Sequence, residues 1–232
     1  MTAPELPTPI VPFVEDEIRP VVRLGLVRAE PILVGPSGEA LLTEIEEICG
    51  NLAERHHGKQ PSEIPDLAPA RDLYRAFGID PTRTRPSSES LLRRVLQGKP
   101  FPRIVNAVDL CNLCSLRFLL PIGLYDAERT RGRVALRRGL PGESYQGIRK
   151  DDVHLQGRIT LADEEGPFGN PTSDSLRTSV TPSTRSLWMV IFAPAGCAKE
   201  DLASHVRVAC DGMARHLGAP GAVVGTSGIV LP

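Results

Sequence analysis

The chain has 232 residues, of which 41% are hydrophobic and 24% are charged, as is usual for a soluble globular protein. Its longest apolar runs are far too short to cross a bilayer, and its Pro-rich start, MTAPELPTPIVPF, lacks the basic residues and apolar core of a signal peptide. We therefore expect no membrane association and a cytoplasmic protein.

Charge is distributed unevenly along the chain, although the formal net charge is only −1. The net charge is −7 over residues 1–70, +9 over residues 71–150 and −3 over residues 151–232. A basic middle third is typical of a surface that faces phosphate groups. Solvated arginine-bearing helix faces give the same pattern, so the charge alone does not decide between the two.

The first part of the chain predicts a strand followed by helices. Residues 1–12 contain four prolines, and we expect them to be flexible and residues 13–232 to form a single domain. Alternating apolar residues predict a strand over 21–29. Helices are predicted over 39–57, 66–77 and 88–97, the last two ending at Gly78 and Gly98, where a positive φ favours glycine. On the second helix we expect an exposed face, formed by Arg71, Asp72, Tyr74 and Arg75.

Residues 103–120 predict a buried helix that ends before Pro121. Asn106, Asp109 and Asn112 lie along one side of this otherwise apolar helix, where short polar residues are unfavourable. They either bond to neighbouring backbone or serve a site. The lone Cys111-x-x-Cys114 pair lies in the same helix, without further ligands at zinc spacing, so we expect these cysteines to be small buried apolar residues.

The second half of the chain changes to short strands. Strands are predicted over 133–138, 154–163 and 186–194, with a turn over 141–145, and a helix over 199–217 ends at Gly218. The order of elements predicts an α+β fold: helices come first, then a mostly antiparallel sheet, and finally a covering C-terminal helix.

The segment GPFGNPTSDSLRT, residues 166–178, has an unusual composition. It contains two glycines, two prolines and four hydroxyl residues in thirteen positions. It is either an ordinary surface loop or the wall of a polar pocket, built from backbone amides and short side chains.

Several chemistries are excluded by missing motifs. The chain has no G-x-x-x-x-G-K-[ST] loop, no G-x-G-x-x-G fingerprint and no G-x-S-x-G elbow, and its histidines are scattered. We therefore expect no nucleotide cofactor and no metal site.

Two motifs in order point to a known family. The first motif is N-x-V-D-x-x-N-L over 106–113, and the second is P-I-G-L-Y-D over 121–126. Five shorter elements follow in order: Gly132–Val134, Gly142–Glu143, Ala162–Asp163, the 166–178 segment and Phe192–Pro194. Over residues 70–195 the chain resembles the B3/B4 domain of the bacterial phenylalanyl-tRNA synthetase β subunit, as a free-standing protein.

The resemblance implies an editing module that hydrolyses the ester between a wrong amino acid and the 3′ end of tRNA. In this interpretation Asp174 is the catalytic residue, which holds the α-ammonium group or orients the water. Backbone amides around Gly166, Gly169 and Asn170 are expected to be the oxyanion donors. The expected pocket residues are Asn106, Asn112, Tyr125, Gly166, Phe168, Gly169, Asn170, Thr172, Ser173, Ser175 and Thr178.

The chain departs from the family pattern at two positions. The family's histidine falls at Gly123, and its glutamate becomes Asp174, which is one methylene shorter. Both changes leave hydrolysis possible but put the family's amino-acid specificity in doubt. The synthetase catalytic core is also missing, so we expect no ligase activity.

Three functions remain open. The first is a trans-editing aminoacyl-tRNA deacylase that binds the tRNA acceptor end and an amino acid, with no DNA partner. Its expected tRNA-binding residues are Arg129, Arg131, Arg133, Arg137 and Arg138. The second is a non-catalytic module that binds tRNA or an amino acid, and the third is an enzyme acting on another small ester or amide.

Overall fold

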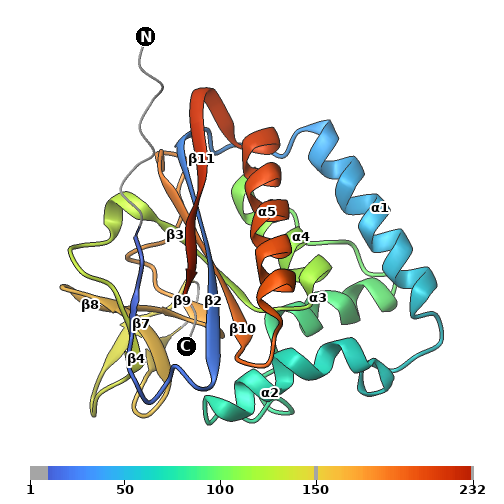
Figure 1. The fold of residues 1–232 in the computed structure, drawn as a ribbon. Helices are drawn as coiled ribbons and strands as arrows, with labels where there is room; N and C mark the ends of the chain where they lie inside the picture. Colours follow the sequence, from blue (N-terminus) through green and yellow to red (C-terminus); the bar gives the residue numbers. More distant parts are fainter. Residues whose placement is uncertain (1–9, 149–150, 231–232) are drawn as a thin grey trace.

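The computed structural model describes residues 10–148 and 151–230 (Figure 1). Most of the segment predicted to be flexible, residues 1–9, lies outside this range. Within it, no helix is both long and apolar enough to cross a membrane.

An antiparallel sheet of four strands runs through the middle of the molecule (Figure 1). Its strand order is β11 (Gly218–Val230), β2 (Val22–Ile32), β10 (Leu187–Pro194) and β3 (Ile122–Asp126). The two inner strands come from opposite ends of the sequence, so this sheet joins the first and last parts of the chain.

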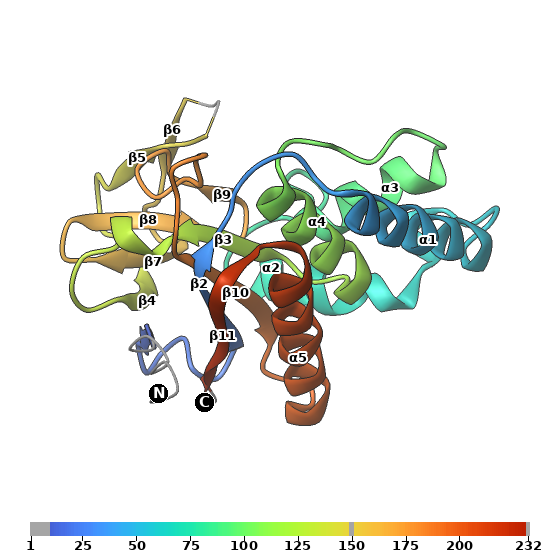
Figure 2. The ribbon, with the colours of Figure 1, turned by 90° about the horizontal axis from the view of Figure 1, so that it is seen from above.

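A second sheet lies on one side of the first, as the view from above shows (Figure 2). Its strands, in spatial order, are β1 (Phe13–Val14), β4 (Ala135–Arg138), β7 (Ile159–Asp163), β8 (Gly166–Asn170) and β9 (Ser173–Asp174). Only the β1–β4 pair is parallel among the described strand pairs of this sheet. A separate hairpin joins β5 (Ser144–Gln146) and β6 (Asp152–His154).

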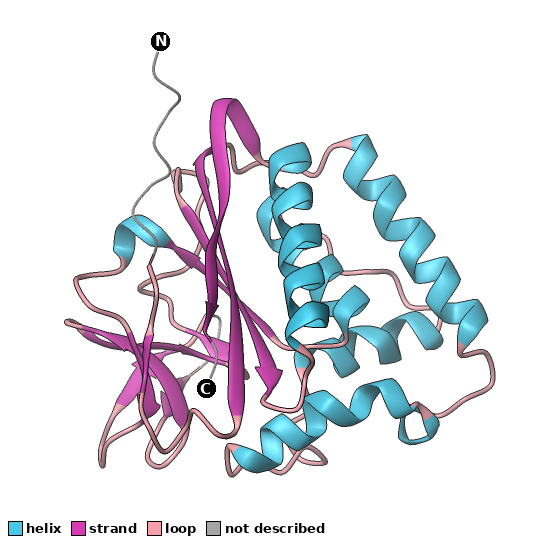
Figure 3. Cartoon of the chain, in the orientation of Figure 1, coloured by secondary structure: helices cyan, strands magenta, loops and turns pink. Residues whose placement is uncertain are grey.

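Helices lie on the other side of the four-stranded sheet (Figure 3), and the second of them also packs Leu73, Tyr74 and Phe77 into the core between the two sheets. Their bounds are α1 (Glu39–Arg55), α2 (Ala68–Ala76), α3 (Ser87–Leu96), α4 (Asn106–Phe118) and α5 (Lys199–His216). Helix α5 packs closely on β2 at Gly25, where a Cβ atom would lie 2.7 Å from Cγ2 of Val206. Short 3₁₀ turns cover Pro61–Glu63, Pro65–Leu67 and Ala127–Arg129.

Strand β10 shows how the sequence divides the core into two layers. Its residues are buried on both faces, and successive side chains of a strand point to opposite faces. Met189 and Ile191 pack with the helices, whereas Trp188, Val190 and Phe192 pack between the two sheets. The continuous apolar run is therefore required by a strand that is covered on both sides.

The α+β class predicted from the sequence is confirmed, and the predicted helices and the strands over 21–29, 133–138 and 186–194 all form. Gly78 and Gly98 follow their helices with φ values of +72° and +64°. The covering C-terminal helix, α5, also forms, but the sequence patterns missed β11, which follows it and completes the sheet. They also missed β3, and the strand predicted over 154–163 is interrupted, with β6 ending at His154 and β7 covering Ile159–Asp163.

The exposed face expected on the second helix was partly wrong. Tyr74 is fully buried, and its hydroxyl donates to the carbonyl of Pro171. Arg71 is half-buried and makes a two-point ion pair with Glu89 at 2.8 and 3.0 Å. Only Asp72 and Arg75 lie on the exposed side, where they pair with each other. Helix α2 is thus packed on both flanks.

Candidate functional site

The unusual 166–178 segment contains a tight hairpin. Strands β8 and β9 pair with Gly169 opposite Asp174 and Asn170 opposite Ser173, so Pro171 and Thr172 form the turn. The Oδ1 atom of Asn170 accepts hydrogen bonds from the Thr172 amide at 2.8 Å, the Thr172 hydroxyl at 2.7 Å and the Ser173 amide at 2.9 Å. Asparagine is favoured in turns for this ability to bond to the following backbone. The hairpin tip is therefore fixed by its own sequence.

All three tyrosines of the chain surround this hairpin. The Tyr74 hydroxyl, from α2, donates to the Pro171 carbonyl at 2.7 Å, and the Tyr145 hydroxyl, from β5, donates to the Ser173 carbonyl at 2.5 Å. Tyr125 approaches from β3 and is fully buried. Two elements that are distant in sequence thus bond to the hairpin backbone, and a third places its tyrosine ring beside it.

Tyr125 occupies space that two glycines leave open. A Cβ atom on Gly123 would lie 2.1 Å from the Tyr125 hydroxyl, and one on Gly169 would lie 2.3 Å from it. Burial raises the pKa of Tyr125 well above its ordinary value, and the neighbouring Asp174 carboxylate raises it further. The hydroxyl therefore remains protonated beside Asp174. Gly123, the position of the family's histidine, has no space for a side chain while Tyr125 is in place.

A cavity of about 430 Å³ lies between this hairpin, α4, β3 and residues 179–182. The apolar residues of its lining are Val105, Val108, Cys111, Ile122, Leu124, Pro171 and Val180. The polar residues of its lining are Asn112, Asn170, Thr172, Ser173, Asp174, Ser179 and Thr181. Ser87, Ile104, Ile148 and Pro182 also line it and are exposed, so they mark its opening.

Asp174 provides the charge of this cavity. Among the described residues that line it, Asp174 is the only one with a charged side chain. The nearby Cys111 is buried, and burial raises the pKa of its thiol well above the ordinary value. The cavity therefore combines one half-buried carboxylate with neutral hydroxyl, amide and apolar groups.

The structure brings five of the predicted site residues together at the cavity: Asn112, Asn170, Thr172, Ser173 and Asp174. Tyr125, Phe168 and Gly169 lie behind this lining, where the rings of Tyr125 and Phe168 pack edge to face at 5.1 Å. Ser175 and Thr178 are buried and their hydroxyls bond to each other at 3.1 Å. They support the hairpin instead of lining the cavity.

Two other expected pocket residues, Gly166 and Asn106, lie away from the cavity. Gly166 lies at the far end of β8, opposite Asp163. Asn106 bonds to the segment after β2, through the Leu33 carbonyl at 2.9 Å and the Gly35 amide at 3.0 Å. Asp109 likewise accepts from the Ser37 hydroxyl at 2.7 Å. These two polar residues of α4 therefore fix the connection between β2 and α1, and Asn112 alone of the three reaches the cavity.

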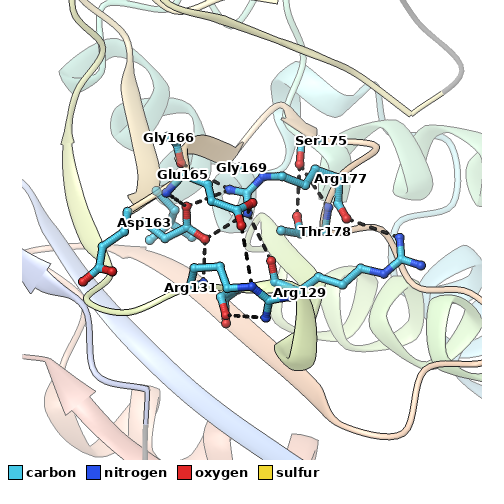
Figure 4. Close-up of polar contacts among 12 residues, drawn as sticks. Arg129, Arg131, Asp163, Glu165, Gly166, Gly169, Ser175, Arg177 and Thr178 are labelled. Atoms are coloured by element: carbon cyan, nitrogen blue, oxygen red, sulfur yellow. Dashed lines mark hydrogen bonds and ion pairs between the residues drawn. The ribbon is translucent and has the colours of Figure 1, made fainter.

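The back of the hairpin is held by a network of ion pairs around Arg177 (Figure 4). Its guanidinium bonds to both carboxylate oxygens of Asp163 and to Glu165 at 3.1 Å, and it lies 5.6 Å from the ring centre of Phe168. Asp163 also accepts from the Arg131 amide at 2.9 Å. The network joins β7, β8 and the segment after β9.

Most of the arginines expected to bind tRNA make contacts within the protein. Arg137 forms a two-point ion pair with Glu143 at 2.7 and 2.8 Å, and Arg138 lies 2.9 Å from Glu17. Arg129 and Arg131 make looser contacts, at 3.6 Å, with Asp126 and Glu165. Arg133 is exposed. Because β7 and β8 separate β4 from β9, the arginines of β4 lie about 14 Å from the Asp174 strand.

Sequence reasoning missed some residues of this site. Tyr74 and Tyr145 were not among the candidates, although tyrosine is scarce in this chain. Ser179 and Thr181 line the cavity just beyond the segment that attracted attention. Among the described residues, no group of three or more His, Cys, Asp or Glu side chains is placed to hold a metal ion.

Fold and site together define an α+β protein with a cavity of small-molecule size. Residues 69–206 match the model of the B3/4 domain family, and the chain belongs to this family. Among solved structures it is similar to an N-terminal fragment of the phenylalanyl-tRNA synthetase beta-subunit from Pyrococcus horikoshii, with 13% sequence identity and a TM-score of 0.44. The match covers 95% of this chain and 52% of that fragment, so the chain spans about half of its length. No curated protein matches the chain.

Proposed function

We propose that this protein is a free-standing aminoacyl-tRNA deacylase, which hydrolyses the ester bond of mischarged tRNA. The observation that carries the proposal is the placement of one carboxylate, Asp174, in a cavity that is lined by both polar and apolar side chains. An amino acid bound through its ester has a positive ammonium group and a side chain close together. The cavity offers a partner for each.

Hydrolysis of an aminoacyl ester needs few catalytic groups from the protein. Water attacks the carbonyl carbon of the ester, the bond from that carbon to the ribose oxygen breaks, and the ribose oxygen takes up a proton. The ester is already activated, so a held water and donors for the developing negative charge suffice. Asp174 binds the ammonium group or orients the water.

The donors for the oxyanion differ from those expected. The amides of Thr172 and Ser173 already donate to Asn170, and Gly166 lies at the other end of its strand. We assign the donor role to the Thr181 hydroxyl, because the Ser183 hydroxyl can donate to it at 2.8 Å, whereas the Ser179 hydroxyl already donates to the Leu176 carbonyl at 2.8 Å.

A non-catalytic module that binds tRNA or an amino acid is the alternative. It is favoured by the absence of histidine and lysine from the described lining of the cavity, since these residues are common general bases. In this alternative Asp174 recognises the ammonium group and no bond is broken.

In this proposal the RNA contacts exposed arginine side chains. Of the five predicted arginines, Arg133 is exposed and forms no ion pair with a described residue, so its charge is available to a phosphate. Two further exposed arginines, Arg85 and Arg103, lie within two residues of Ser87 and Ile104 at the cavity opening. Contacts of these residues to phosphate would be sequence-tolerant and sensitive to salt.

The deciding experiment is release of amino acid from a panel of correctly and incorrectly charged tRNAs. Asp174→Asn should lower the rate by roughly 100-fold, as expected for loss of a group that acts directly on the substrate or water. Asp152→Asn, which removes an exposed carboxylate of β6, is the matched control and should leave the rate unchanged.

Three results would count against the deacylase. Release from mischarged tRNA at the wild-type rate in Asp174→Asn would remove Asp174 from the mechanism. Salt-dependent tRNA binding without release from any charged tRNA would establish the binding module. If the protein neither releases an amino acid nor binds tRNA, the result would favour an enzyme acting on another small ester or amide.

A further inference from the structure

The Tyr125 hydroxyl differs from the other two tyrosine hydroxyls in what it faces. Tyr74 and Tyr145 donate to backbone carbonyls of the hairpin, so both have a structural use. The hydroxyl of Tyr125 is buried, donates no hydrogen bond among the described residues, and lies beside Gly169, which is directly opposite Asp174 in the hairpin. It is therefore the tyrosine hydroxyl that is left to donate to the charge of the cavity.

The position of this hydroxyl is fixed from all sides. The ring packs against Phe168 at 5.1 Å and against Trp188 at 5.6 Å between ring centres. Gly123 and Gly169 enclose the hydroxyl so closely that a methyl group at either position would overlap it. A buried ring held in this way has one orientation, and its hydroxyl is preorganised before any ligand arrives.

The side chains near Asp174 show why the Tyr125 hydroxyl matters for the charge of the carboxylate. The side chains that interact with the carboxylate include Tyr74, Tyr125, Tyr145 and Cys111, from α2, β3, β5 and α4. Burial raises the pKa of all four, so each is neutral at ordinary pH. A protonated hydroxyl that lies beside an ionised carboxylate stabilises the charge when it donates to it.

We propose that Tyr125 is a positioning residue for Asp174: its hydroxyl, enclosed by Gly123 and Gly169, orients the carboxylate toward the cavity and keeps it there. The inference rests on the proposed function, in which Asp174 receives the amino-acid end of the substrate. It assigns to Tyr125 an effect on the reaction without contact with the reacting atoms.

The test compares three single substitutions in the full chain: Tyr125→Phe, Tyr74→Phe and Tyr145→Phe. Each removes one hydroxyl and keeps the ring, so the packing around the hairpin is preserved. The first readout is the titration of the Asp174 carboxyl group by carbon-13 NMR, with Asp174→Asn used to assign the signal. Tyr125→Phe should raise the pKa of Asp174, because a donor to its charged form is lost, and the other two variants should change it less.

The second readout is deacylation of a mischarged tRNA as a function of pH. Tyr125→Phe should lower kcat/KM by about tenfold, which is typical for loss of a hydrogen bond to a charged group, and shift the acid limb of the profile upward. Gly123→Ala displaces the same hydroxyl from the other side and should reproduce the shift of Asp174 with Tyr125 still present.

An unchanged Asp174 titration in both Tyr125→Phe and Gly123→Ala would overturn the proposal and leave Tyr125 a space-filling residue. A change of equal size in all three tyrosine variants would overturn it too, since it would reflect general loosening of the hairpin. If no variant and no wild-type protein releases amino acid, the proposed function fails, while the NMR titration still decides the role of Tyr125.

Discussion

The guanidinium of Arg177 binds both carboxylate oxygens of Asp163, at 2.8 and 3.0 Å, and the Asp163 side chain is fully buried in this pair. The pair joins the turn between β7 and β8 to the segment that follows β9. The shape of the hairpin at the cavity thus depends on a contact made behind it.

We predict that Arg177→Gln lowers the free energy of unfolding by about 3 kcal/mol, because it leaves a buried carboxylate without its charged partner. Urea denaturation measures the change. Arg75→Gln is the control, since Arg75 pairs with Asp72 where both side chains are at least 60% exposed, and such pairs contribute little. Equal effects of the two substitutions would show that the buried pair has no special importance.

A second prediction concerns which arginines meet RNA. Arg133→Glu should weaken tRNA binding and reduce the slope of log affinity against log salt concentration by about 1, because an exposed phosphate contact is lost. Arg137→Gln should leave that slope unchanged and lower the melting temperature, since Glu143 loses its two-point partner. Filter binding at several salt concentrations and thermal unfolding measure the two effects. A loss of binding in Arg137→Gln with an unaltered melting temperature would reverse this assignment.

The third prediction is a pH dependence of stability that arises from His56. Burial lowers the pKa of this histidine below the ordinary value of 6.5, and the nearby Arg55 and Lys59 lower it further. The neutral form is therefore favoured in the folded state. Its contribution to stability is complete above pH 6.5 and is lost as the pH falls through the lower pKa of the folded protein.

Unfolding by urea between pH 7.5 and pH 5 tests this directly, in a range above most carboxyl titrations. His56→Gln should reduce the pH dependence, and part of it should remain because burial also lowers the pKa of His205. Replacement of the exposed neighbour, His57→Gln, should leave it unchanged. An equal pH dependence in His56→Gln and the unsubstituted protein would assign the effect to another group.

Much of the helical layer follows from the sequence, because its signals are local. Apolar spacing defines α1, α3, α4 and α5, and Gly78 and Gly98 adopt the positive φ that their position after a helix predicts. Strand β10 can also be predicted from the sequence, since a strand that is covered on both faces requires a run of apolar residues.

The candidate site was harder to predict from the sequence, because contacts between residues that are distant in sequence form it. Strand β8, with the sequence GPFGN, has no β-branched residue, and it is a strand because it pairs with β7 and leaves room for Tyr125 at Gly169. Polar residues of α4 also gave an ambiguous signal. Asn106 and Asp109 bond to the segment before α1, and nothing in their spacing distinguishes them from Asn112 at the cavity.

The central position of β2 has a consequence for how the molecule is made. Its hydrogen-bonded neighbours, β10 and β11, are both synthesised after most of the chain has left the ribosome. Until then its backbone edges have no native strand partner, and such edges are prone to association with other chains. Pairing across so much sequence also slows folding. The nascent chain must therefore keep its first long strand from aggregating until its last two strands arrive.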